Sequence, residues 1–248
     1  MSYTIITGSS SGIGAATARL LAEQGHNLLL LARSTDKLSR LRGELLAKFQ
    51  VEVEIFTVDV TDSQQVDDFV DAIADKSISA LINNAGLALG TDKFHEGDLA
   101  EFEQMIAVNV TGAVRMARLL IPCLQKTQGH IVNISSIAGR EPYGGGSVYC
   151  GTKSFVKTLS KCMRIDLCGT GVRVTDIAPG AVETNFSNVR FRGDDERADK
   201  YYEDFEPLTP EDIAETIWFA LNRPKHVNIE SMVVYPTAQA SPNHLSRT

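Results

Sequence analysis

Three residues in the middle of the chain are spaced so that they could transfer a proton. Tyr149 and Lys153 stand four residues apart, and Ser136 lies thirteen residues before the tyrosine. A phenol with its ordinary pKa of about 10 is a poor base at neutral pH. A lysine one helical turn away stabilises the phenolate by its charge, so we interpret Tyr149 as a general acid or base whose pKa Lys153 lowers. An amphipathic helix with one aromatic residue and one solvated lysine would show the same spacing.

Two further polar residues favour the catalytic interpretation. Ser136 follows an apolar segment at 130–134 that we predict to be a strand, so it lies at the carboxyl edge of a sheet, where open α/β sheets bind ligands. Its hydroxyl could polarise a substrate oxygen beside the tyrosine. Asn109 stands in the middle of a predicted helix, where an asparagine side chain competes for backbone hydrogen bonds. A local kink or a bound water is therefore expected there, with a purely structural asparagine as the alternative.

A glycine-rich segment near the N-terminus could hold a phosphate. Residues 7–14 read TGSSSGIG, after a predicted strand at 3–7 and at the start of a predicted helix at 13–24. Glycines let the backbone turn tightly beside a pyrophosphate, and the free N–H groups of a helix N-terminus bind it. An ordinary Gly/Ser loop is the alternative. The cofactor-binding residues predicted here are Gly8, Ser9, Ser10, Ser11, Gly12, Ile13 and Gly14.

The end of the second predicted strand indicates which nucleotide is bound. Arg33 and Ser34 stand there, and no carboxylate is present to bind the ribose hydroxyls of NAD. A guanidinium pairs well with a 2′-phosphate, so we predict NADP, although Arg33 could also be a solvated residue at a helix start. Asp59, followed by Val60, could accept from the adenine amino group or cap a helix. Beside the adenosine ribose we expect Asn84, Ala85 and Gly86.

The whole chain alternates short apolar runs with helix-length segments. This alternation predicts an α/β, doubly wound (Rossmann) sheet of about seven parallel strands with helices on both faces, in a single domain over 1–248. Two helix starts carry capping signals, at Thr61 and at Thr209. A polar segment interrupts the alternation, and we expect a substrate loop at about 182–208. The strands are predicted at 3–7, 27–32, 51–58, 80–83, 130–134, 172–177 and 231–235.

Composition limits the possible partners. The net charge is −7 without a basic block, which argues against nucleic acid and anionic membranes. No apolar run is long enough to span a bilayer, and no signal peptide is recognisable. The four cysteines form no C-x-x-C pair, so we expect reduced thiols, no metal site and a cytoplasmic protein. Cys150, next to Tyr149, lacks a recognisable histidine partner and is interpreted as a packing residue.

The motifs together resemble those of the short-chain dehydrogenase/reductase family, in order and spacing, over nearly the whole chain. They comprise Thr7–Gly14, Asn83–Gly86, Asn109, Ser136, Tyr149, Lys153, Pro179-Gly180 and Thr184. The resemblance implies that Asn109, Ser136, Tyr149 and Lys153 form a catalytic tetrad, in which Asn109 holds a water in a proton relay from Lys153. It also implies a homotetramer or homodimer. Residues implied to contact the nicotinamide half of the cofactor are Pro179, Gly180, Val182 and Thr184.

A narrower resemblance concerns the substrate. The segments 83–90, 173–177 and 186–195 are similar to those of the NADP-dependent 3-hydroxy acid dehydrogenases, with the sulfoacetaldehyde reductases as close relatives. Both groups imply a small anionic hydroxy acid or aldehyde substrate. The residues implied to bind it are Arg190, as the cation, with Ser136, Tyr143, Tyr149 and Gln239. Arg190 could instead pair with Asp194 or Asp195 at the surface. A non-catalytic protein that senses NADP is the alternative of another class.

Overall fold

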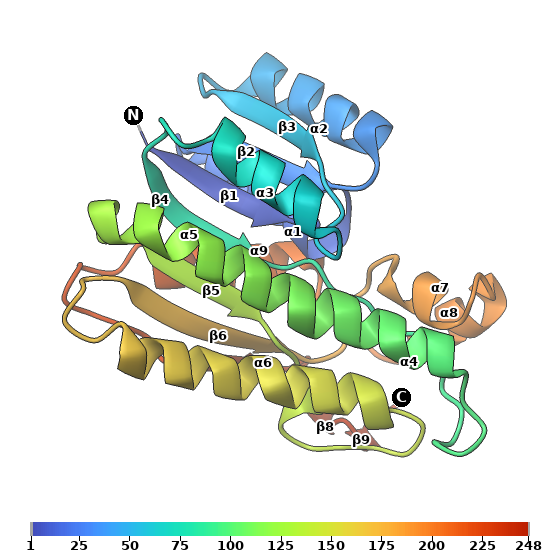
Figure 1. The fold of residues 1–248 in the computed structure, drawn as a ribbon. Coiled ribbons are helices and arrows are strands. Elements are labelled where there is room, and N and C mark those ends of the chain that lie inside the picture. Colours follow the sequence, from blue (N-terminus) through green and yellow to red (C-terminus); the bar gives the residue numbers. More distant parts are fainter. Residues whose placement is uncertain (1, 248) are drawn as a thin grey trace.

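Seven parallel strands form one sheet in the order β3-β2-β1-β4-β5-β6-β7 (Figure 1). The computed structural model describes residues 2–247. The strands are β1 (Tyr3–Thr7), β2 (Asn27–Ala32), β3 (Val53–Thr57), β4 (Ile78–Asn83), β5 (His130–Ile134), β6 (Arg173–Pro179) and β7 (Ser231–Val234). All seven predicted strands are confirmed, with shifts of one or two residues at some of their ends.

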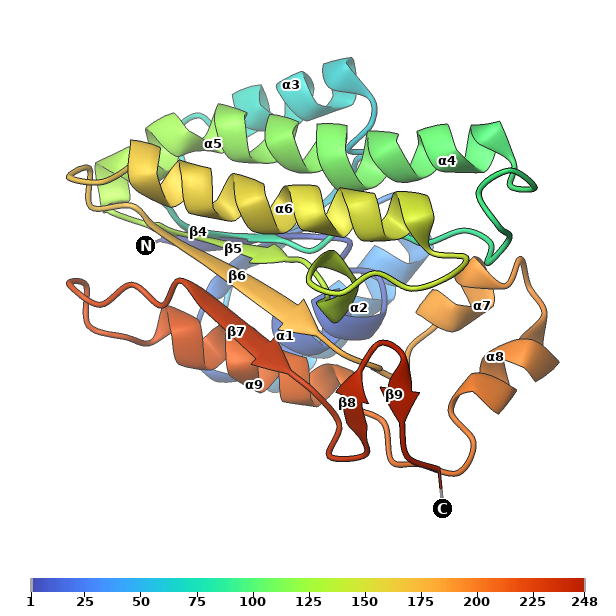
Figure 2. The ribbon, with the colours of Figure 1, turned by 90° about the horizontal axis from the view of Figure 1, so that it is seen from below.

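Helices cover both faces of the sheet (Figure 2). One face carries α1 (Gly12–Glu23), α2 (Thr35–Lys48) and α9 (Pro210–Leu221). The other carries α3 (Ser63–Ala72), α4 (Leu99–Ile106), α5 (Ala113–Thr127) and α6 (Ser147–Asp166). Two short helices, α7 (Phe186–Arg190) and α8 (Asp195–Tyr201), lie beyond the carboxyl ends of the strands (Figure 1). The predicted doubly wound α/β architecture is therefore confirmed.

Successive residues of the central strands point to opposite faces, as the strand period of two requires. Ile5 packs in the core under α3, α5 and α6, whereas Ile6 packs in the core under α1, α2 and α9. In β2 the leucines at 29 and 31 share the first core, and those at 28 and 30 share the second. Because both faces are covered, these strands are apolar at every position instead of alternating with polar residues.

The strand order reverses between β1 and β4. On one side of this point β2 and β3 follow β1 outward, and on the other side β5, β6 and β7 follow β4 outward. Crossovers on either side of such a point leave a crevice at the carboxyl ends of the two strands. The glycine-rich turn after β1 and the segment after β4 border this crevice. The fold therefore places the predicted phosphate and proton-transfer residues at one edge of the sheet.

Two details differ from the sequence predictions. The capping signal at Thr61 is wrong, because Asp62 caps α3 by accepting from the Gln65 N–H, while the Thr61 hydroxyl donates to Asp59 at 2.7 Å. The capping box at Thr209 is confirmed. A small hairpin, β8 (Gln239–Ser241) with β9 (His244–Leu245), was not predicted.

The helical segment α4 to α5 is continuous from Leu99 to Thr127 and includes one turn of π-helix, η1 (Ala107–Gly112). Its 29 residues and a mean hydropathy of 1.3 over its most apolar window would suffice, by length and composition alone, to cross a membrane. In the fold its residues Met116, Leu120 and Leu124 are fully buried in the core beside β4. The predicted absence of membrane contact stays a prediction.

Candidate active site

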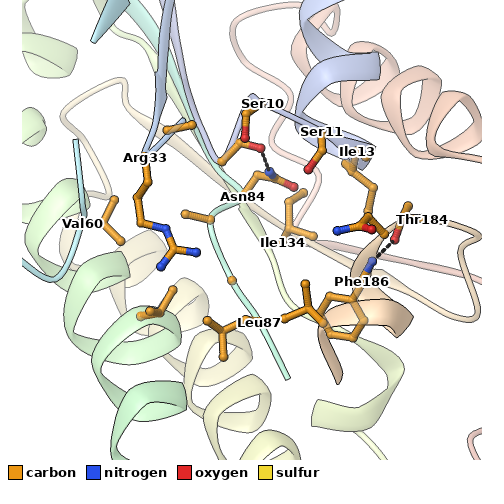
Figure 3. Close-up of a pocket in the computed structure, with 18 of the residues that line it drawn as sticks. Ser10, Ser11, Ile13, Arg33, Val60, Asn84, Leu87, Ile134, Thr184 and Phe186 are labelled. Carbon is orange, nitrogen blue, oxygen red and sulfur yellow. Dashed lines mark hydrogen bonds between the residues drawn. The ribbon is translucent and has the colours of Figure 1, made fainter. Parts of the chain in front are cut away.

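A long cavity of about 660 Å³ follows the carboxyl edge of the sheet from Arg33 to Tyr149. The turn between β1 and α1 borders it through Ser10, Ser11 and Ile13, at the N-terminus of a twelve-residue helix (Figure 3). The free N–H groups of that first turn and the helix dipole favour an anion there. α1 has no side-chain cap and no acidic residue in its first turn, so its own residues leave this position free for an anion.

The turn is compact because two of its positions have no room for a side chain. A Cβ at Gly14 would lie 2.4 Å from the carbonyl oxygen of Gly8, and Gly8 itself has a φ of +66°. The Asn84 amide fixes the turn from the end of β4, donating to the carbonyl oxygens of Thr7 at 2.9 Å and Gly8 at 3.3 Å. The backbone is thereby held open toward the cavity, and a pyrophosphate can approach it.

The outer end of the cavity, opposite the Tyr149 end, is bordered by two cations. Arg33 reaches into it from the end of β2, opposite Thr184 and Phe186 (Figure 3). Within residues 2–247 the Arg33 guanidinium makes no ion pair, and Lys37, which the sequence analysis did not single out, lines the same region. Ser34, Asp59 and Val60 also border it. Two cations and no partner for Arg33 fit a 2′-phosphate better than they fit a free ribose hydroxyl.

Asp59 has a clear structural function in addition to its place beside the cavity. Its Oδ1 accepts from both the N–H and the hydroxyl of Thr61. Its own N–H donates to the Gln65 side chain at 2.9 Å. The carboxylate thus shapes the turn that precedes α3, but Asp62 caps that helix, so the capping alternative for Asp59 is wrong. The contact of Asp59 with the adenine amino group stays a prediction.

Ser136, Tyr149 and Lys153 meet at the inner end of the cavity. Tyr149 and Lys153 project from one face of α6, and both are less than 10% exposed. The Lys153 ammonium donates to the carbonyl oxygen of Ile134 at 2.9 Å and lies 5.9 Å from the Tyr149 ring centroid. The Ser136 hydroxyl accepts from the Ala138 N–H at 3.1 Å, which fixes it at the start of a short 3₁₀ turn after β5. The predicted three-residue group is therefore brought together.

Asn109 lies behind this group and does not border the cavity. It sits in the π-helical turn, 2% exposed, where it accepts from the Leu87 N–H and donates to the Leu87 carbonyl oxygen, each at 2.8 Å. It also donates to the Thr152 hydroxyl at 3.1 Å. Single π-turns inside α-helices are frequent at functional sites. The predicted irregularity is present, and a Cβ at Gly86 would touch both Asn109 and Lys153 at 3.2 and 3.3 Å.

Burial dominates the electrostatics of the pair. It raises the pKa of the Tyr149 phenol above its ordinary range, and the Ser136 hydroxyl and the Arg190 charge oppose this only in part. It also lowers the pKa of the Lys153 ammonium to about 8, with partial compensation by the Asp176 carboxylate. The predicted lowering of the tyrosine pKa by Lys153 is therefore not what the structure shows, because desolvation of the phenolate has the larger effect. Tyr149 is held as a protonated phenol.

A second cavity of about 410 Å³ adjoins the first and shares Ser136 and Tyr149 with it. The Arg190 guanidinium lies over the rings of Tyr143 and Tyr149, at 5.2 and 5.9 Å from their centroids. Its Nε is buried and has no hydrogen-bond partner within residues 2–247. Neither Asp194 nor Asp195 pairs with it, since they accept from the Arg197 N–H and the Asn188 amide. The surface alternative for Arg190 is therefore wrong.

Gln239 also borders this second cavity, from the unpredicted hairpin. It is buried and accepts from the Ala181 N–H at 2.8 Å through its Oε1. This bond fixes the turn after β6, where Gly180 passes so close that a Cβ would lie 2.5 Å from the same oxygen. Gln239 thus shapes the wall of the cavity and leaves its amide nitrogen available.

Most of the predicted cofactor residues border the first cavity, and two do not. Ser9 is buried and its hydroxyl donates to the Leu31 carbonyl oxygen, while Gly14 packs inside the turn. Those that line the cavity are Gly8, Ser10, Ser11, Gly12, Ile13, Arg33, Ser34, Asp59, Val60, Asn84, Ala85, Gly86, Tyr149, Lys153, Pro179, Gly180, Val182 and Thr184. Lining residues that were missed include Lys37, Leu87, Ile134 and Phe186. Leu87 and Phe186 lie in the segments 83–90 and 186–195 that carry the narrower resemblance, but no local motif marks these residues, Ile134 or Lys37 as lining a cavity.

A doubly wound sheet with a glycine-rich helix N-terminus open to a long cleft and a Ser–Tyr–Lys group at the inner end of that cleft is typical of a dinucleotide-dependent oxidoreductase. Known proteins agree with this class. The family model described as short chain dehydrogenase matches residues 2–195. This chain belongs to the short-chain dehydrogenase family and is an oxidoreductase.

Individual relatives are similar over nearly their full length. The NADP-dependent 3-hydroxy acid dehydrogenase of Schizosaccharomyces pombe is 43% identical over 98% of this chain and 95% of that protein. The NADP-dependent 3-hydroxy acid dehydrogenase YdfG of Escherichia coli K12 is 40% identical over 95% of each. The solved structure of the closed form of serine dehydrogenase complexed with NADP+ has a TM-score of 0.91, with 39% identity and 96% coverage of both chains.

Proposed function

We propose that this protein is an NADP-dependent dehydrogenase that interconverts small 3-hydroxy acids, such as serine, allo-threonine or 3-hydroxypropionate, with the matching 3-oxo acids or semialdehydes. The observation that carries the proposal is the position of Arg190, a cation with a free buried Nε beside the Tyr149 phenol. The names of the relatives at 40% and 43% identity support the same substrate class.

The cavity residues fit NADP. Ser10, Ser11 and Ile13 would hold the pyrophosphate at the start of α1, and Arg33 with Lys37 would hold the 2′-phosphate. The nicotinamide half would lie toward Tyr149, against Pro179, Gly180, Val182 and Thr184. When bound, NADP supplies the hydride donor or acceptor for the substrate carbon.

Tyr149 transfers the proton in this mechanism. In reduction its phenol gives a proton to the substrate oxygen as that oxygen becomes a hydroxyl; in oxidation the phenolate takes the proton back. An ordinary phenol is protonated at neutral pH, and burial raises the pKa of Tyr149 further, so the residue enters the reductive direction as a proton donor. Lys153 supplies positive charge next to the phenolate, and Ser136 donates a hydrogen bond to the substrate oxygen. We assign Asn109 to holding the backbone around Leu87 and Lys153 in place, and a water in the proton relay would lie against it.

Arg190 sets the substrate class. Its guanidinium would bind the acid group of the substrate through charge-assisted hydrogen bonds, with Tyr143 beside it. Burial raises the pKa of Tyr143 to about 12, so its hydroxyl is a hydrogen-bond donor at neutral pH. We further propose that 182–208 is the substrate loop, because it carries Arg190 and its helices α7 and α8 border the second cavity.

A substrate panel tests this function. Oxidation of 3-hydroxypropionate, serine and allo-threonine, and reduction of malonic semialdehyde and sulfoacetaldehyde, would be followed at 340 nm with NADP(H) and with NAD(H). We expect the highest kcat/KM for a carboxylate substrate with NADP(H). A clear preference for sulfoacetaldehyde would assign the sulfonate branch instead. Tight NADPH binding without turnover of any panel member would favour the NADP-sensing alternative.

A further inference from the structure

The second cavity is larger than a three-carbon hydroxy acid requires. Its volume is about 410 Å³, whereas 3-hydroxypropionate, with six non-hydrogen atoms, fills at most about 180 Å³ if each atom takes the roughly 30 Å³ of one water. Cavities of this size usually enclose ligands with several more non-hydrogen atoms. The space beyond Arg190 is therefore available for an additional part of the substrate.

That additional space is bordered by positive charge. Of the side chains that line the second cavity, three are cationic, namely Arg190, Arg197 and Lys200, and none is an aspartate or glutamate. The chain as a whole is acidic, with a net charge of −7. A positively charged cavity wall on a negatively charged protein concentrates its field on a negatively charged ligand.

The two cations on α8, Arg197 and Lys200, are exposed, whereas Arg190 is half-buried. Arg197 and Lys200 are three residues apart in α8, so their side chains share one face of that helix. Arg190 ends α7 and reaches the tyrosines at the inner end of the cavity. The cavity thus has an inner cationic position beside Tyr149 and an outer pair on α8.

The outer pair makes no direct ion pair within residues 2–247, although Asp92, which pairs with Arg192, lies near enough for the Arg197 charge to help lower its pKa. The Arg197 guanidinium stacks over the Phe191 ring at 4.7 Å and donates to the Thr91 hydroxyl at 2.7 Å. Among residues 2–247, neither it nor Lys200 makes an ion pair. Two of the three acidic residues at the start of α8 are engaged elsewhere, since Asp194 caps the helix and Asp195 accepts from Asn188, while Glu196 makes no direct ion pair with Lys200 within residues 2–247. An anionic group could be bound by the outer pair without displacing an internal salt bridge.

We propose that the preferred substrates carry two anionic groups: a hydroxy acid whose first carboxylate binds Arg190 and whose second carboxylate, at the far end of the chain, binds Arg197 and Lys200. This inference rests on the proposed function. In oxidation the C3 carbon of such an acid loses its hydrogen as hydride to NADP+ and its hydroxyl proton to Tyr149, which leaves a 3-oxo diacid. The second carboxylate takes no part in bond making, and it contributes binding alone.

The test compares two substrates of equal length. 3-Hydroxyadipate ends in a second carboxylate, whereas 3-hydroxyhexanoate ends in a methyl group at the same position. We expect the wild-type kcat/KM to favour 3-hydroxyadipate by about fivefold, as an ion pair at the rim of a cavity provides, and the preference to shrink as ionic strength rises. In the double variant Arg197→Gln/Lys200→Gln the ratio should fall to near one. Lys126→Gln, on an exposed residue outside both cavities, is the matched control and should keep the wild-type ratio.

A binding measurement separates this inference from the proposed function. Adipate and hexanoate lack the hydroxyl, so their affinities, measured by calorimetry in the presence of NADP+, do not depend on turnover. Preferential adipate binding that the double variant loses would support the outer anion site even if no 3-hydroxy acid were oxidised. A wild-type preference for the mono-acid in both assays, or a ratio that the double variant leaves within twofold of wild type, would overturn the inference.

Discussion

The guanidinium of Arg190 lies 5.9 Å from the centre of the Tyr149 ring. If the guanidinium binds the carboxylate of a 3-hydroxy acid, the reacting carbon C3, which is two bonds from the carboxylate carbon, would lie within reach of the phenol. The same positive charge opposes, in part, the rise of the tyrosine pKa that burial causes. One residue thus links recognition of the acid group to the position of the proton donor.

Replacing the guanidinium should reduce activity on acids and spare activity on neutral aldehydes. For Arg190→Gln we expect kcat/KM for malonic semialdehyde to fall roughly 10- to 100-fold, the value of a lost charge-assisted hydrogen-bond pair. Propanal, which has the same number of carbons and no carboxylate, should lose less than threefold. Steady-state kinetics with both aldehydes checks this, and an equal loss on both would show that Arg190 acts on the site's structure instead.

Cofactor choice should depend on Arg33. In Arg33→Gln we expect kcat/KM for NADP+ to fall at least about tenfold while that for NAD+ changes little, because only NADP carries the 2′-phosphate. Arg40→Gln, an exposed arginine of α2 outside the cavity, serves as the control. A parallel loss with both cofactors would argue against a phosphate contact.

Burying Lys153 has a cost that should appear in the pH dependence of stability. Its pKa is about 8 in the folded protein against an ordinary value of 10.5, so between these two pH values the unfolded chain binds more protons. Stability then rises with pH across this window, by up to about 1.4 kcal/mol per pH unit and about 3 kcal/mol in all, and the full penalty applies below pH 8.

The free energy of unfolding, measured by urea denaturation of wild type and Lys153→Met between pH 7.5 and 10, checks whether stability rises with pH. The variant should lack the rise, and Lys126→Met, at an exposed lysine, should retain it. The unpaired Ile134 carbonyl in Lys153→Met lowers stability at every pH and does not affect the slope. Equal slopes in all three proteins would show that Lys153 titrates normally when folded.

Arg192 anchors the segment 182–208, which we propose as the substrate loop. This residue has a left-handed φ of +58° and pairs with Glu101 and Asp92, at 2.7 Å each. The Gly90 N–H donates to the Arg190 carbonyl oxygen at 2.9 Å beside it. For Arg192→Gln we expect faster amide hydrogen exchange over residues 186–201 and a rise in the substrate KM of about threefold to tenfold.

Arg19 offers a matched control, because it forms a similar exposed pair with Glu44 far from both cavities. Arg19→Gln should change neither the exchange in 186–201 nor the KM. Since exposed ion pairs contribute about 1 kcal/mol or less, both variants should unfold within about 1 kcal/mol of wild type. Unchanged exchange in Arg192→Gln would mean that the backbone alone holds the loop.

The sheet and the chemical group were predictable because each depends on local patterns. Apolar runs covered on both faces identify the strands, and the TGSSSGIG turn identifies the first crossover. Tyr149 and Lys153 share a helix face by spacing alone. Ser136 joins them because the end of β5 lies next to α6, and only a parallel sheet with right-handed crossovers places it there.

What the sequence did not reveal depends on contacts between distant segments. Arg197 and Lys200 border the second cavity because α8 folds back over the strand ends, and no local motif marks them. The hairpin that carries Gln239 was missed because its strands are two and three residues long. The direction of the Tyr149 pKa shift was mistaken because the spacing to Lys153 is visible in the sequence and the burial of the phenol is not.

Tyr149→Phe tests the central claim most directly, because it removes one hydroxyl and keeps the ring against Phe186. NADPH binding would be titrated by fluorescence, and turnover of malonic semialdehyde would be followed at 340 nm on the same preparation. We predict unchanged NADPH affinity with kcat reduced at least about a hundredfold, the size of a lost general acid. A variant that binds NADPH and turns over at the wild-type rate would contradict the assignment of Tyr149 as the proton donor.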